Sequence, residues 1–168
     1  MGVGLRALVA AVLLLVLAVP ASADGGWQPP DGWTIQNASG TRMIVIWTGL
    51  RADDFTPNIN VLWDRTHGVD AEWSATSEAL SATGVDVTSR SVACALGRGV
   101  RFAYDLTIGA RSLSIVSYLV PDDGGGTYVA TYTRLAARAA EPQVLEALGG
   151  ICALRPTADP PRRDMARR

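Results

Sequence analysis

The only imidazole in the chain belongs to His67, which lies in Asp64-Arg-Thr-His67-Gly-Val-Asp70 between an expected strand and an expected helix. An imidazole next to a carboxylate can act as a general base when a nucleophile lies within hydrogen-bond reach. Asp64 and Asp70 are the nearby acids, but the nucleophile-elbow pattern G-x-S-x-G is absent from the sequence. We therefore expect no catalytic residues, and we keep a hydrolase site around His67, Asp64 and Asp70 as the alternative.

Two pairs of adjacent aspartates, Asp53-Asp54 and Asp122-Asp123, are the next groups that could bind a cation. Calcium loops need several oxygen ligands at staggered spacings, and neither pair has that pattern. One histidine cannot supply the usual zinc ligands. We expect a polar turn at 122–126, no metal site and no cofactor. A Walker-type phosphate loop is excluded because the chain has no lysine.

The chain contains two cysteines, Cys94 and Cys152. Two cysteines in an exported protein are most simply explained by one disulfide bond. A metal pair would need more ligands than one histidine supplies, and a redox pair usually has the C-x-x-C spacing that is missing here. We predict a structural disulfide between Cys94 and Cys152.

The N-terminus has the three parts of a cleavable signal peptide in the right order. Arg6 precedes an apolar run over 7–19, which is followed by Pro20 and by Ala21-Ser22-Ala23. The run is short for a membrane anchor, the alternative interpretation, because a spanning helix needs about 20 apolar residues. We predict cleavage before Asp24, a secreted or extracytoplasmic location, and no transmembrane segment in the mature chain.

The remaining sequence predicts one α+β domain. The strands are expected at 33–36, 42–47, 58–65, 85–95, 99–107, 111–121 and 127–135, with short turns that make the last four an antiparallel meander. A helix is expected from Asp70, as its N-cap, to Gly84, and a second helix from about Glu141. The order is β-β-β-α-β-β-β-β-α, with an antiparallel sheet of six or seven strands and two helices.

This pattern divides the chain into four parts. Residues 1–23 are the signal peptide, 24–32 a Pro/Gly-rich linker, 33–155 the single domain, and 156–168 a disordered Arg/Pro-rich tail. The formal net charge is −1, so nucleic acid is not an expected partner.

Exposed aromatic residues near the linker give the candidate binding surface. Trp27 and Trp33 flank the Pro-Pro sequence, and a tryptophan pair can bind a sugar, a lipid or a protein surface. The alternative is that this arm folds back onto the domain. Asp53 and Asp54 lie in the loop between two expected strands. We predict that a ligand or partner contacts Trp27, Trp33, Asp53 and Asp54.

The segment Phe55-Thr-Pro-Asn-Ile-Asn-Val61, the helix, the Gly-flanked meander and then Gly126-Thr-Tyr-Val-Ala-Thr-Tyr132 before a final helix resemble the PsbP-like fold. The layout over about residues 31–155 is most similar to the actinobacterial LpqN-type exported proteins. That type carries a lipobox cysteine that this chain lacks, so the resemblance implies release rather than lipid anchoring. It also implies a sandwich without an active site, in a family of accessory or binding proteins.

The function expected from these features is that of an exported, non-catalytic binding or accessory protein of the cell envelope or secretome. Its partner would be a hydrophobic small molecule or an envelope protein. The alternatives are the hydrolase near His67 and a purely structural protein that works through its Arg-rich tail.

Overall fold

The computed structural model describes residues 29–36, 43–51 and 53–153. The predicted signal peptide, most of the predicted linker with Trp27, and the predicted tail from residue 156 lie outside these ranges.

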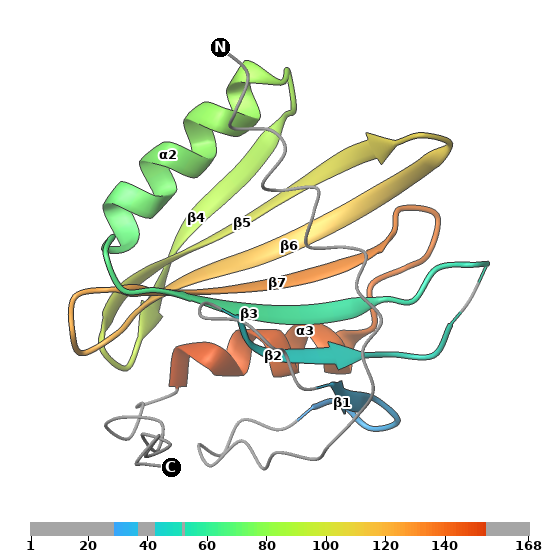
Figure 1. The fold of residues 1–168 in the computed structure, drawn as a ribbon, viewed down its shortest axis with the longest axis horizontal. Helices are drawn as coiled ribbons and strands as arrows, with labels where there is room; N and C mark the ends of the chain where they lie inside the picture. The colour runs from blue at the N-terminus through green and yellow to red at the C-terminus, as the bar shows by residue number, and fades with distance from the viewer. Residues whose placement is uncertain (1–28, 37–42, 52, 154–168) are drawn as a thin grey trace, which may run out of the picture.

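Seven strands and two α-helices form the described part of the chain, in the predicted order β-β-β-α-β-β-β-β-α (Figure 1). Each strand begins and ends within two residues of its predicted bounds. The strands are β1 (Thr34–Gln36), β2 (Met43–Thr48), β3 (Asn58–Asp64), β4 (Val87–Cys94), β5 (Gly97–Ile108), β6 (Arg111–Pro121) and β7 (Thr127–Leu135). The helices are α2 (Val69–Ala82) and α3 (Pro142–Gly149), and a short 3-10 helix, η2 (Gly150–Ala153), follows α3.

The strands form one antiparallel sheet in the order β1-β2-β3-β7-β6-β5-β4. Short turns keep β4, β5, β6 and β7 adjacent, as a meander requires. The longer connection through α2 carries the chain from β3 to the far edge of the sheet, and the meander then returns so that β7 pairs with β3. This pairing places the end of β3 beside the turn between β6 and β7.

The two helices cover opposite faces of the sheet (Figure 1). Successive residues of a strand point to opposite faces, and the neighbours Leu119 and Val120 of β6 are both buried. Leu119 packs in a cluster with Val69 and Leu80 of α2, whereas Val120 packs in the cluster that contains α3. Burial on both sides makes β6 the centre of the core.

Helix α2 begins one residue before the prediction and is capped differently. Its N-cap is Gly68, which has no side chain to bond the free N–H groups, so the prediction that Asp70 caps the helix is wrong. Asp70 lies in the first turn instead, where a carboxylate is still stabilised by the positive end of the helix dipole.

Helix α3 begins at Pro142, whose missing N–H is not needed in the first turn. Val144 and Leu148 are completely buried against the sheet. The helix tightens into η2, and Cys152 there is bonded to Cys94 at the end of the edge strand β4, as predicted. The amide of Ala95 also donates a hydrogen bond to the carbonyl oxygen of Cys152, at 2.7 Å. The edge strand and the C-terminal segment are therefore held together by two links.

Within the described ranges, no helix has the length and apolar character needed to cross a membrane.

Replacing both cysteines by alanine is expected to lower the free energy of unfolding by about 3–4 kcal/mol, because the disulfide closes a long loop in the unfolded chain. The two cysteines are 58 residues apart in sequence. Urea unfolding of the double variant Cys94→Ala/Cys152→Ala measures this loss. The matched control is the native protein with and without dithiothreitol, since reductant should weaken only the native chain. Equal urea midpoints for the variant and the native protein would contradict the prediction.

Candidate functional site

Candidate residues of the described chain fall in the two connections of β3, whose ends point in opposite directions along the sheet. The loop that precedes Asn58 carries Asp53 and Asp54. The connection that follows Asp64 carries His67 and leads into α2 with Asp70. We call the first region the 49–57 loop and the second, residues 64–72, the His67 corner. Trp27 lies outside the described residues.

The His67 corner rests on the turn between β6 and β7. Asp122 starts this turn, and its carboxylate is buried and accepts two hydrogen bonds. One comes from the amide of Gly126 at 2.5 Å, and the other from the Trp63 indole Nε1–H at 2.6 Å. The predicted polar turn at 122–126 is therefore closed by its first aspartate, which also bonds the strand next to it.

Two further contacts fix the backbone of the corner. A Cβ on Gly126 would lie 2.4 Å from the carbonyl oxygen of Asp64, so only glycine allows the turn to pack this closely against the end of β3. The hydroxyl of Thr127, which is completely buried, donates a hydrogen bond to the carbonyl oxygen of His67 at 2.8 Å. The backbone that carries His67 is thus held by β7.

Asp64 and His67 are brought together by this backbone. Asp64 Oδ2 lies 3.1 Å from His67 Nδ1. Asp64 Oδ1 accepts hydrogen bonds from the Thr66 hydroxyl at 2.6 Å and from the Thr66 amide at 2.7 Å. These bonds, chiefly those from Thr66 and then that from His67, hold the pKa of the Asp64 carboxyl far below its ordinary value. The His67 side chain is 57% exposed and that of Asp64 only 13%.

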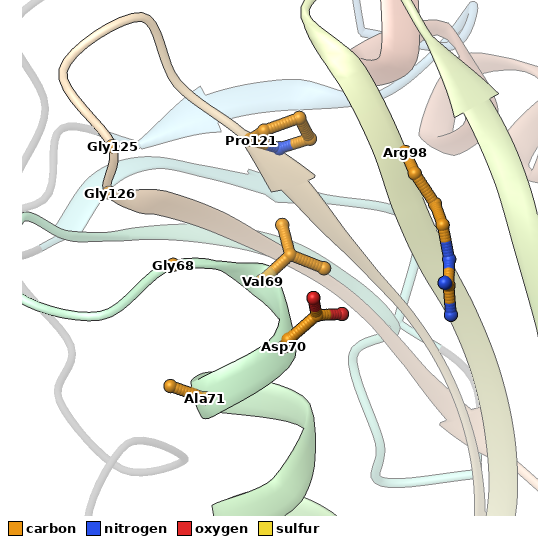
Figure 2. Close-up of a pocket in the computed structure, with 8 residues that line it drawn as sticks. All are labelled: Gly68, Val69, Asp70, Ala71, Arg98, Pro121, Gly125 and Gly126. Atoms are coloured by element: carbon orange, nitrogen blue, oxygen red, sulfur yellow. The ribbon is translucent and has the colours of Figure 1, made fainter.

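Glu72, not Asp70, completes the cluster around His67. One ligand atom each from Asp64, His67 and Glu72 lies within 4.8 Å of the other two. Asp70 instead lines a neighbouring pocket of about 280 Å³, together with Arg98 of β5 and with Gly125 and Gly126 of the 122–126 turn (Figure 2). Asp64 and His67 are therefore in contact, as the hydrolase alternative requires. Asp70 lies outside this cluster and lines the neighbouring pocket.

At the opposite end of β3, Trp33 packs onto the domain. Its ring makes an edge-to-face contact with that of Tyr132, with ring centroids 6.0 Å apart. A Cβ on Gly49 would lie 2.9 Å from the Trp33 ring, so the chain enters the 49–57 loop directly against this tryptophan. For Trp33, the structure agrees with the interpretation that this arm folds back onto the domain.

Asp53 and Asp54 lie in the same 49–57 loop and have an unusual backbone conformation. Their φ angles are 50° and 58°, a left-handed conformation that is uncommon for residues other than glycine. Arg51 binds Asp54 at 2.7 Å, and Arg138, from the segment after β7, binds Asp53. Leu50, in the same loop, is 84% exposed.

Sequence reasoning missed two residues at these ends. Glu72 is five residues from His67, and its proximity depends on α2 beginning directly after Gly68, which no side-chain cap announces. Leu50 stands in a loop between a glycine and an arginine, where an apolar residue has no core position to occupy. An apolar residue within a loop of this composition was the signal from which an exposed apolar side chain could have been predicted.

The His67 corner offers two kinds of chemistry. The Asp64 carboxylate can orient an imidazole that removes a proton, as in hydrolases. The same carboxylate, the imidazole and Glu72 can alternatively supply one nitrogen and two oxygen ligands to a metal ion. The 49–57 loop has no imidazole, and both of its carboxylates are paired with arginines.

Comparison with known proteins gives no relative from which either site could be interpreted: no protein-family model and no curated protein matches the chain.

Proposed function

We propose that this protein is an exported, non-catalytic binding or accessory protein of the cell envelope or secretome, and that its partner binds the 49–57 loop. The observation that carries the proposal is Leu50, a large apolar side chain that is 84% exposed. Protein contact surfaces commonly combine an apolar centre with a polar rim, and Leu50 lies beside the charged Arg51.

The conformation of the loop supports this proposal. Two consecutive non-glycine residues in the left-handed region cost roughly 1–3 kcal/mol each, so other contacts must hold them there. The exposed ion pairs of Asp53 with Arg138 and of Asp54 with Arg51 supply part of that stabilisation. Backbone strain of this kind is concentrated at binding and switch regions. The predicted binding residues Asp53 and Asp54 would thus act by presenting Leu50 as well as by direct contact.

Export is supported by the signal-like N-terminus and by the disulfide, because disulfides persist in oxidising compartments. The element order agrees with that expected for the PsbP-like, LpqN-type exported proteins, and we propose membership of that group on the motifs quoted above. On this proposal, the protein is released after cleavage and works by contact with a hydrophobic small molecule or an envelope protein.

A photo-cross-linking experiment in the producing cells tests the proposed surface. We expect p-benzoylphenylalanine in place of Leu50 to give a discrete cross-linked product on illumination. Ile108 is the other large apolar side chain that is exposed among the described residues, at 38%, and it provides the matched control position. Mass spectrometry of the product identifies the partner. Absence of a product at position 50, or the same products at positions 50 and 108, would contradict the proposal.

A hydrolase at the His67 corner is the second candidate, favoured by the 3.1 Å contact of Asp64 Oδ2 with His67 Nδ1. A screen of ester and glycoside substrates separates the two candidates. If the corner is catalytic, His67→Ala should lower turnover by at least about a hundredfold, the usual contribution of a general base. Asp70→Asn, outside the cluster, should leave turnover unchanged. Turnover that is equal in the native protein and His67→Ala would exclude this candidate.

A further inference from the structure

The His67 corner brings together three groups that commonly bind metal ions. Asp64 stands at the end of β3, His67 in the connection, and Glu72 in the first turns of α2. Their ligand atoms lie within 4.8 Å of one another. In a tetrahedral zinc site with bonds of about 2.0–2.2 Å, neighbouring ligand atoms are roughly 3.3–3.6 Å apart. Small side-chain adjustments, which the 57% exposure of His67 permits, therefore complete the site.

The two carboxylates of the corner lack a cationic partner other than His67 among the residues that the structure describes. The Glu72 carboxylate has no hydrogen bond or ion pair with any of them. Arg65, the closest arginine in sequence, places its guanidinium 3.9 Å from the centre of the Trp63 ring instead. Two carboxylates held close together in this way favour a bound cation, which neutralises their repulsion.

The corner is also held in place before any ion binds. The carbonyl oxygen of His67 accepts a hydrogen bond from Thr127 of β7, and the imidazole ring of His67 contacts Asp64 and Thr66. Because the backbone of Asp64 and His67 is already fixed, these two ligands lose little conformational freedom when they bind a metal ion. The third ligand, Glu72, lies on a helix whose Leu80 is anchored in the core.

We propose that Asp64, His67 and Glu72 bind a divalent transition-metal ion such as Zn²⁺, with two carboxylates in place of the additional histidine or cysteine ligands of the usual zinc sites. An imidazole nitrogen selects zinc and its first-row neighbours over Mg²⁺ and Ca²⁺, which prefer oxygen ligands alone. Three protein ligands leave a coordination position open for water or a substrate group. This inference does not rest on the proposed binding role of the 49–57 loop, which lies at the other end of β3.

The single histidine of the chain gives a direct test, since its imidazole signals in an NMR spectrum belong to one residue. The purified protein, without an affinity tag, is titrated with ZnCl₂. We expect the His67 ring signals to shift and to reach saturation at one equivalent of zinc. Chelation by EDTA should restore the original spectrum, and MgCl₂ at the same concentration should leave it unchanged.

Variants test whether the three residues form the site, and the control Asp70→Asn removes the same single negative charge as Glu72→Gln. Glu72→Gln should raise the zinc concentration needed for half-saturation at least tenfold, and His67→Gln should abolish the one-equivalent binding measured by equilibrium dialysis. Asp70→Asn removes a carboxylate from the same helical turn but outside the cluster, and should bind zinc as the native protein does. The proposal is overturned if zinc does not shift the His67 signals, if Mg²⁺ binds equally well, or if Glu72→Gln binds zinc with unchanged affinity.

Discussion

The burial of both faces of β6 is the constraint on which the rest of the structure depends. Leu119 and Val120 are neighbours on this strand, and each is almost inaccessible on its own side of the sheet. Burying an aliphatic side chain of this size contributes about 1.5–3 kcal/mol, so each face needs its own cover. Helix α2 covers one side and α3 the other, and the chain must leave the sheet after β3 and after β7 to provide them.

This arrangement leaves the two ends of β3 for the two proposed sites. Both helices lie across the faces of the sheet (Figure 1). Each connection of β3 gives one buried side chain to the interior, Phe55 before the strand and Val69 after it, and its other described side chains are not buried. One connection holds Leu50 exposed over two strained aspartates. The other holds Asp64 and His67 against the turn that Asp122 closes. Rigid strands with functional groups in their connecting segments are a common division of labour in proteins.

The meander was predictable from the sequence because local signals are strong there. Strands β6 and β7 have the predicted bounds, since alternating apolar residues are interrupted by the glycines and aspartates of the 122–126 turn. The disulfide partners were predictable because the chain has only two cysteines. In these places, residue type alone limited the possible structures.

The candidate sites depended on information that is not local. The start of α2 was misjudged because Gly68 caps it through backbone conformation alone, and the predicted role of Asp70 followed from that error. The position of Glu72 near Asp64 depends on α2 beginning directly after Gly68. The backbone between them is held by the hydrogen bond from Thr127 to the carbonyl oxygen of His67, a contact between residues far apart in sequence. The pairing of Asp53 with Arg138 similarly joins segments that no local pattern connects.

Hydrogen exchange followed by mass spectrometry tests the central claim, that the core is centred on β6 and that the connections at the two ends of β3 lie largely outside it. The account predicts that amides of β6 and β7 exchange most slowly, through unfolding of the whole domain, and that the 49–57 loop exchanges fastest. The edge strand β4 should show intermediate protection. Exchange of β6 as fast as that of β4 would contradict the account, because the strand buried on both faces would then not be the centre of the fold.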